Sequence, residues 1–443
     1  MGRIFVCTII FIGMVGYSTL YAQEEKECKK EQRLVITGVI PGSYAETIDI
    51  RPGDVITTYN GQEVHCLNKL TMLKDGVNTD SVEIVIKRDN EFVTFVIPKG
   101  QIGVWVKELL PDIVFDEDAV VIEGIGPLDW GTGESNSFIA ALTRIAEHLD
   151  IDRNYTFFMG VSGAAFRILF HEDWCPSSPD PTVGFDCGEI AIKSIKYEPK
   201  YFHYDKEKKN QEEIQQKIME SIDKKMPVIA IDLIEVAEWG LIVGYQKQGR
   251  ELIVRDYFSR REGYDIAEKF PWVAVIIPPL VRSEYIAEED YFKKSLKIAQ
   301  ELYETEKYDA YYSGTAAIDY WIKKLKEDTF STMEDKKFDD VMLANAWIYQ
   351  RLAEDRKFAA EYLKSFASTF PKIEDKIAEL VILYETVHKL MAESGSIVLY
   401  PSQMTTRNDW TDEMRQKEIE ILTKVLVKER EAYSLIKEIS EKI

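Results

Sequence analysis

The sequence is poor in residues that ligate metals, and it carries no excess of positive charge. Its five histidines are scattered along 443 residues, and neither a CxxC nor an HxxxH spacing occurs, so we expect no metal site and no other cofactor. The formal net charge is −21, and a chain this acidic is repelled by polyanions. Nucleic acid is therefore excluded as the main partner.

Long apolar runs are also missing, except at the start of the chain. Arg3 precedes the run IFVCTIIFIGMV, which is followed by small and polar residues up to Ala22. This pattern is typical of a secretory signal peptide over residues 1–22, because the run is shorter than the roughly 20 residues that span a bilayer. We expect an exported protein, periplasmic or extracellular, with a linker over 23–32. The alternative is an uncleaved segment that anchors the protein in the membrane.

Export to an oxidising compartment changes how the few cysteines are interpreted. Removal of the leader leaves four of them, and Cys175 and Cys187 flank the proline-rich stretch PSSPDPTVGFD. We predict a disulfide between these two, because this loop has little else to hold it. Cys28 and Cys66 form a second candidate pair.

The first domain is predicted over residues 33–108, where apolar residues recur at every second position between turn residues. The stretch VIPGSYAETIDIRPGDVITTYNGQEV resembles the PDZ family in its bacterial form, most specifically in RPGDVI. Turn chemistry explains that string. Pro52 fixes φ, Gly53 can adopt a positive φ, and Asp54 can bond local amides before the next strand.

This resemblance implies a mostly-β domain that binds peptide or protein C-termini as an added strand. No glycine-rich loop precedes Val35, whereas GQIGV ends the domain over residues 100–104. That order is similar to the permuted bacterial PDZ domains, in which the C-terminal side supplies the strand that lines the groove. The resemblance therefore implies peptide-binding roles for Ile102, Gly103 and Val104. The alternative is an edge strand that only leads into the next domain.

Residues 119–280 combine helical and strand patterns, which predicts an α+β domain. GESNSFIAALTRIAEHL has the spacing of an amphipathic helix, and four apolar runs of strand length come later: PVIAIDLI, WGLIVGYQ, ELIVRDYF and WVAVIIPP. Together with MGVSGAAFRI, these segments resemble the papain-like superfamily. The resemblance is to the bacteriocin-leader peptidases and to the N-terminal domain of the butirosin-biosynthesis acyltransferase in particular.

That superfamily uses a cysteine thiolate at a helix N-terminus and a histidine base on the sheet, oriented by an acidic or amide residue. Carried over to this sequence, the three positions fall on Asn136, Glu238 and Asp256. Two of them lack the required group, which implies a pseudo-peptidase in which Asn136 caps the helix. The alternative is an amidohydrolase or acyltransferase with Ser137 as nucleophile and Glu238 as base, although an exposed glutamate with its ordinary pKa is a poor base.

We expect a ligand cleft to survive beside these degenerate positions. Ser162, Gly163, Arg167 and Trp239 are predicted to line it, because the glycine-rich segment is more specific than packing alone requires. Arg167 could hold an anionic group of a small ligand, or it could pair with a structural carboxylate.

Proline and strand patterns largely vanish after residue 283, and five or six amphipathic segments follow, which predicts an α-helical bundle over 283–443. The polar segment SIVLYPSQMTTRNDW, residues 396–410, interrupts these helices and could cover the cleft. The sequence thus predicts a multidomain exported protein that binds peptides or a small ligand. Its parts are a PDZ domain, a degenerate papain-like domain and a helical bundle.

Overall fold

The computed structural model describes residues 31–40, 43–99, 102–130, 132–207, 209–280 and 286–443. The chain divides into two compact units: unit 1 is Met1–Asp112 with Arg260–Glu262, and unit 2 is Ile113–Ser259 with Gly263–Ile443. The regions 119–280 and 283–443 thus belong to the same unit. The predicted signal peptide and Cys28 lie outside the described residues. Among those described, no helix has the length and apolar character needed to cross a bilayer.

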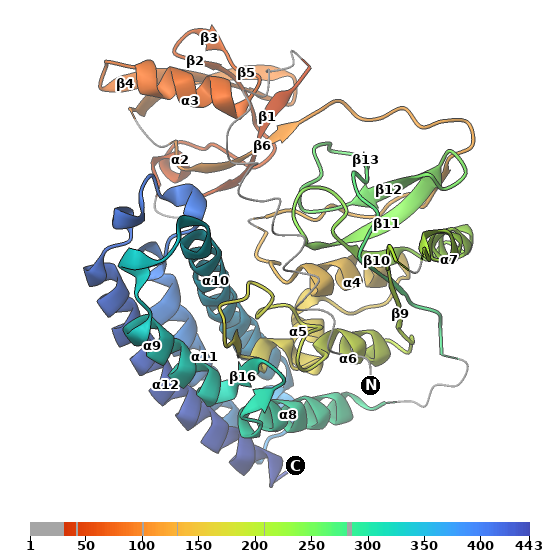
Figure 1. Ribbon diagram of the computed structural model, residues 1–443, viewed down its shortest axis with the longest axis vertical. Helices are drawn as coiled ribbons and strands as arrows, with labels where there is room; N and C mark the ends of the chain where they lie inside the picture. The colour runs from red at the N-terminus through yellow and green to blue at the C-terminus, as the bar shows by residue number, and fades with distance from the viewer. Residues whose placement is uncertain (1–30, 41–42, 100–101, 131, 208, 281–285) are drawn as a thin grey trace. The chain divides into compact units, whose positions relative to one another are not determined.

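Unit 1 is a mostly-β domain built on one antiparallel sheet (Figure 1). Its strands are β1 (Arg33–Val39), β2 (Val55–Tyr59), β3 (Gln62–Glu63), β4 (Ser81–Arg88), β5 (Glu91–Pro98) and β6 (Val104–Leu109). They lie in the order β5-β4-β2-β1-β6, with β3 beside β2. Two helices complete the unit: α2 (Tyr44–Thr47) and α3 (Leu67–Gly76). The expected alternation is present, since Val82, Ile84 and Ile86 of β4 are buried and Ser81 and Glu83 are exposed.

The RPGD turn of unit 1 is fixed by a buried carboxylate. Gly53 has a φ of +92°, a conformation that glycine adopts readily. Asp54 is almost fully buried, and its Oδ2 accepts a hydrogen bond from the Arg51 amide at 2.8 Å. Both carboxylate oxygens also accept from the Arg88 guanidinium of β4 at 2.7 Å. The local role predicted for Asp54 is therefore confirmed. Through Arg88, Asp54 also joins this turn to β4.

Unit 2 contains an antiparallel sheet of seven strands. They are β7 (Val120–Val121), β9 (Lys200–His203), β10 (Val228–Ile231), β11 (Trp239–Gln246), β12 (Glu251–Arg255), β13 (Asp265–Ile266) and β14 (Val273–Ile276). The order is β13-β12-β11-β10-β14-β9, with β7 paired to β11. Every residue of β11 is buried, and the helices α4 (Ser137–His148) and α7 (Gln211–Asp223) pack on it. A helical part on an antiparallel sheet is the arrangement expected for this region.

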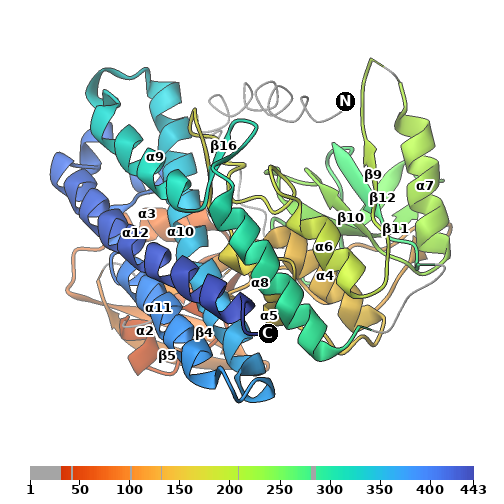
Figure 2. The same ribbon diagram turned by 90° about the horizontal axis from the view of Figure 1, so that it is seen from below.

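The C-terminal half is helical, as predicted. Beside α5 (Tyr155–Val161) and α6 (Cys187–Ser194), unit 2 has α8 (Glu288–Glu304), α9 (Gly314–Glu327), α10 (Asp335–Phe366), α11 (Glu374–Ala392) and α12 (Asp412–Ser440). The hairpin of β15 (Lys307–Tyr308) and β16 (Tyr311–Ser313) adds to β8 (Leu169–His171). Helix α11 packs between α10 and α12, and Figure 2 shows α8 running beside α6. Short 3₁₀ turns, not a long helix, occupy residues 395–409.

The segment MGVSGAAFRI is where the long helices meet the rest of unit 2. A Cβ atom at Gly160 would overlap the ring of Tyr362 on α10, and one at Gly163, whose φ is +85°, would overlap Ile298 on α8. Only glycine permits such close approach of backbone and side chain. The distinctive glycines of this segment are therefore explained by packing.

A buried arginine on α10, Arg356, also bonds to this segment. The Arg356 guanidinium donates to the carbonyl oxygens of Ala165 at 2.6 Å and Phe166 at 3.3 Å. It also donates from Nε to Glu429 Oε1 on α12 at 2.7 Å, with both side chains fully buried. The hydroxyl of Tyr303 donates to the same carboxylate. Because a buried charge is costly unless it is paired and hydrogen-bonded, this cluster fixes how α8, α10 and α12 dock on the segment 164–167.

The disulfide predicted between Cys175 and Cys187 is absent. Both residues are in the thiol form. Cys175 Sγ lies 2.9 Å from Ser177 Oγ, whereas Cys187 is fully buried as the first residue of α6. The loop between them does not need a disulfide, because Arg167 donates to the carbonyl oxygens of Ser178 and Val183, both at 2.9 Å.

Candidate functional site

Strand β6 forms one end of the sheet of unit 1. It pairs antiparallel with β1, from Arg33 opposite Leu109 to Val39 opposite Val104. No described strand pairs with its other edge. An exposed strand edge presents amides and carbonyl groups to which a further strand can add.

The loop before β6 has a shape that requires glycine. Gly103 has a φ of +85°, and a Cβ atom there would overlap Ser43. Its carbonyl oxygen accepts hydrogen bonds from the Ile40 amide at 2.9 Å and from Ser43 Oγ at 3.0 Å. Ile102 is buried in the apolar core, and Val104 is half-buried at the start of the strand. The three residues predicted to bind peptide therefore lie together at the beginning of this edge strand.

Helix α3 borders the same apolar cluster as β6. Leu70 and the half-buried Leu73 belong to the cluster that also contains Val104 and Val106. At the other end of the strand, the amide of Leu67 donates to the Glu108 carboxylate, which joins the start of α3 to β6. The geometry thus offers an extended peptide a strand edge and, beside it, an apolar surface.

The second candidate site is the start of α4 in unit 2. Asn136 is the N-cap, as predicted, and its Oδ1 accepts from the Ile139 amide at 3.2 Å. Its own amide donates to the hydroxyl of Tyr155 at 2.9 Å. The amide and hydroxyl of Ser135 donate to the Glu354 carboxylate of α10, at 2.9 and 2.5 Å. The amides of Ser135, Asn136 and Ile139 are therefore each hydrogen-bonded to groups of the protein itself.

A buried arginine holds the α10 side of this site. Arg351 donates to Ser135 Oγ at 2.5 Å and pairs with Glu354 at 3.3 Å and with Asp355. Burial raises the pKa of Asp355 to about 6, although the Arg351 charge opposes the shift. Anions are favoured at a helix N-terminus, so Glu354 is stabilised by Arg351 and by the dipole of α4.

Ser137 faces Glu238 across the start of β11. Ser137 Oγ donates to Glu238 Oε2 at 2.6 Å and accepts from the Trp239 amide at 3.3 Å. Burial raises the pKa of Glu238 to about 8, and the carboxylates of Asp180 and Asp256 add to the shift. Since the Asn136 side chain is used as a cap, the residue that geometry places opposite Glu238 is Ser137.

Asp256, the third position carried over from the superfamily, lies near this pair. It is almost fully buried, and its Oδ1 accepts from the Phe258 amide at 2.8 Å. A Cβ atom at Gly240 would come within 3.0 Å of Asp256 Oδ2, which places this oxygen beside the start of β11. The structure thus brings the regions of Asn136, Glu238 and Asp256 together.

The predicted cleft residues divide into two groups. Trp239 contacts Ser137 through its amide, its indole Nε1 donates to Asp180 at 2.9 Å, and its ring packs edge-to-face on Phe138. Ser162 is fully buried, with Oγ donating to the Phe158 carbonyl oxygen. Gly163 packs on α8, and Arg167 holds the loop 178–183 through carbonyl groups, with no carboxylate partner among the described residues. Ser162, Gly163 and Arg167 thus make packing or loop contacts in the structure, and the anion-binding role of Arg167 stays a prediction.

The sequence indicated that residues 396–410 cover this site, but it did not assign Arg351, Asp355 or Tyr400 to it. The signal for Arg351 and Asp355 was an ionic pair at i, i+4 spacing within the buried face of a helix. Tyr400 had no such signal. Its hydroxyl donates to Gln350, and burial, together with the nearby carboxylates of Glu238 and Glu354, raises its pKa. This placement agrees with the expectation that residues 396–410 cover the site.

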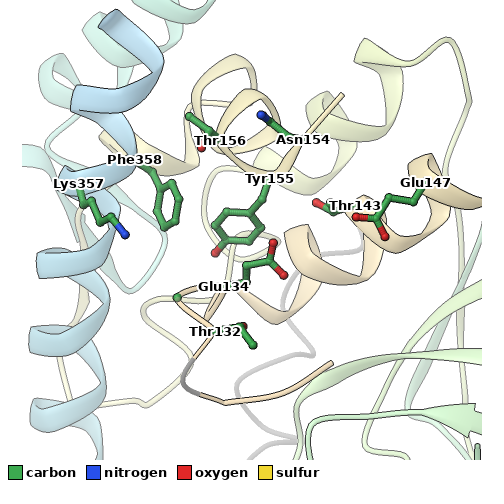
Figure 3. A pocket seen from close by; sticks show the side chains of 10 residues that line it. Thr132, Glu134, Thr143, Glu147, Asn154, Tyr155, Thr156, Lys357 and Phe358 are labelled. Atoms are coloured by element: carbon green, nitrogen blue, oxygen red, sulfur yellow. The ribbon is translucent and has the colours of Figure 1, made fainter. Parts of the chain in front are cut away.

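A separate polar pocket of about 270 Å³ lies on the other side of Tyr155. Figure 3 shows the Tyr155 ring at its centre, between Phe358 of α10 and Thr143 of α4. Burial raises the pKa of Glu134, one of the lining residues, although Arg144 pairs with it. Sequence analysis gave no sign of this pocket, because its walls come from segments far apart in the chain.

The raised pKa of Glu238 predicts a pH-dependent stability. An unfolded glutamate has a pKa of about 4.3. Between that value and about 8 the folded state keeps a proton that the unfolded state loses. The contribution of Glu238 to the free energy of unfolding is therefore complete below about pH 4.3, decreases as the pH rises, and is lost once the pH passes about 8. From pH 6 to 8 the loss is roughly 2 kcal/mol. Glu238→Gln removes this component, which urea unfolding followed by tryptophan fluorescence can measure.

Glu418 provides an internal control for this measurement. Burial raises its pKa to about 8 as well, and it contributes the same slope in both proteins. Identical pH dependence in the wild type and in Glu238→Gln would show that Glu238 does not hold its proton in the folded state.

A known family is recognised within unit 1. A PDZ domain family model matches residues 35–88, from β1 to the end of β4. Among curated proteins, none matches this sequence. The match covers a small part of the chain and ends before β6. Unit 1 therefore contains a PDZ domain, and PDZ domains bind peptides or partner proteins.

Proposed function

We propose that this exported protein binds peptide C-termini at the edge of β6, and that unit 2 is a papain-like module without catalytic activity. The observation that carries the peptide binding is the edge of β6, with which no described strand pairs; β6 starts after the positive-φ Gly103 and borders the same apolar cluster as α3. Export rests on the N-terminal sequence pattern alone.

In this proposal an extended peptide adds antiparallel to β6, and its terminal carboxylate lies at the loop that ends in Gly103. Main-chain hydrogen bonds then supply affinity, and pockets for alternate side chains supply specificity. Val104 and Val106, half-buried on the cluster that includes Leu70, would contact the apolar side chains of the peptide.

The absence of catalysis is supported by the hydrogen bonds that three amides near Ser137 already make. A reaction at this helix would need amides that can receive the developing charge of an oxyanion. Here Tyr155 accepts from the Asn136 amide, Glu354 accepts from the Ser135 amide, and Asn136 Oδ1 accepts from the Ile139 amide. The resemblance to bacteriocin-leader peptidases supplies the papain-like assignment, which stays part of the proposal.

The second candidate function is a serine-dependent amidohydrolase or acyltransferase. One observation favours it: Ser137 Oγ is 2.6 Å from Glu238, whose pKa of about 8 is close to that of an efficient general base near neutral pH. This removes part of the objection that an ordinary glutamate is too weak a base.

Covalent labelling separates the two functions. We expect a fluorophosphonate probe to leave the folded protein unlabelled at pH 7 and at pH 9, because the amides of Ser135, Asn136 and Ile139 around Ser137 already have acceptors. Labelling is read by mass spectrometry of the peptide that contains residue 137. Labelling that rises with pH and disappears in Ser137→Ala, but persists in Ser135→Ala, would establish the enzyme instead.

The peptide-binding proposal predicts a loss of affinity in Gly103→Ala. The new Cβ would overlap Ser43 and displace the loop, so fluorescence anisotropy with a labelled apolar peptide should show at least about tenfold weaker binding. Amidation of the peptide C-terminus should weaken binding of the wild type to a similar extent.

Gly61→Ala is the matched control. Gly61 also has a positive φ, +72°, but a Cβ atom there meets open space, and the residue lies in the turn between β2 and β3. It should keep the affinity for the peptide. Equal binding of free and amidated peptides, unaffected by Gly103→Ala, would contradict capture of a C-terminus at this loop.

A further inference from the structure

Glu108 lies at the far end of β6 from Gly103 and reaches toward α3. Its carboxylate accepts from the amide of Leu67, the first residue of α3. The positive end of the helix dipole favours an anion at this point. Within the described residues only Oε1 of Glu108 is engaged, so Oε2 is left for a second donor.

The pleat of β6 places Glu108 on the side that a bound peptide would contact. Side chains two residues apart share one face of a strand, so Glu108 shares its face with Val104 and Val106. These two valines pack against the cluster to which Leu70 of α3 belongs. Lys107 and the exposed Trp105 belong to the opposite face.

Antiparallel pairing fixes which ligand residue meets Glu108. Each residue of an added strand lies opposite one residue of β6, and directly opposed side chains point to the same face. If the C-terminal residue of the ligand lies opposite Val104, then the residue about two positions earlier faces Val106. The residue about four positions earlier faces Glu108.

The charge of Glu108 and the net charge of the chain both favour a basic ligand side chain. Val104 and Val106 favour apolar side chains at the ligand residues opposite them. The Glu108 carboxylate favours a cation at the ligand residue opposite it. The chain as a whole carries a formal charge of −21 and attracts basic peptides over acidic ones.

We infer that the ligands of this protein are peptide C-termini with apolar residues at the last and third-last positions and a lysine or arginine about four positions before the last residue. Glu108 is the specificity residue that selects the basic side chain. This inference rests on the proposed binding of peptide C-termini to β6.

The test uses the full chain and two labelled peptides that differ only in charge, Lys-Ala-Val-Ala-Val and Glu-Ala-Val-Ala-Val, each with a free carboxylate. Fluorescence anisotropy at low salt should show about fivefold tighter binding of the lysine peptide to the wild type. Glu108→Gln keeps an oxygen for the Leu67 amide and should bind both peptides equally. Glu108→Lys should prefer the glutamate peptide.

Glu83→Lys is the matched control, because Glu83 is exposed on β4, opposite Val96 of β5, and makes the same change in net charge. It should keep the preference for the lysine peptide. If both peptides bind with equal affinity, or if Glu83→Lys and Glu108→Lys change the preference alike, the role of Glu108 is refuted and binding of C-termini stands. If neither peptide binds, the proposed function fails, and this inference fails with it.

Discussion

The arrangement of unit 2 depends on how the amides at the start of α4 are satisfied. The first amides of a helix have no partner within it, and this one starts inside the protein, with Ser135, Asn136 and Ser137 all buried. Asn136 supplies an acceptor for the Ile139 amide, and Glu354 of α10, itself held by Arg351, accepts from the Ser135 amide just before the helix. The C-terminal helices are thus hydrogen-bonded to the chain just before α4, close to Ser137 and Glu238. The contacts of Arg351 and Glu354 with Ser135 thus join α10 to the start of α4 and occupy polar groups near Ser137.

In unit 1, by contrast, backbone groups along the edge of β6 are not paired with another described strand. The edge of β6 stays open among the described residues, and the chain shapes the loop before it with Gly103, whose carbonyl oxygen is held by Ile40 and Ser43. An open edge beside an apolar cluster is a liability unless a partner covers it. We therefore propose that unit 1 carries recognition, through strand addition, whereas polar groups near Ser137 in unit 2 are hydrogen-bonded within the protein.

Local patterns predicted much of this correctly. Alternation in β4, the cap at Asn136 and the turn at Gly53 each depend on neighbours within a few residues. Predictions that depended on distant partners fared worse. Gly163 was assigned to a cleft, but the structure requires glycine there because Ile298, 135 residues later, packs against it. The Cys175–Cys187 disulfide seemed plausible from spacing, whereas Arg167 holds the loop and Cys187 is buried in α6. The pKa of Glu238 could not be read from the sequence, because burial sets it.

The most direct test of the account restores the chemistry that unit 2 is proposed to have lost. In Ser137→Cys with Glu238→His, a thiol would replace the hydroxyl that now lies 2.6 Å from Glu238, at a helix N-terminus and beside an imidazole. Its pKa follows from the pH dependence of iodoacetamide alkylation, read by mass spectrometry of the peptide that contains residue 137. The account predicts a pKa well below the ordinary value of about 8.5, with no such drop in Ser137→Cys alone. A pKa near 8.5 in the double variant would contradict a papain-like centre at these positions.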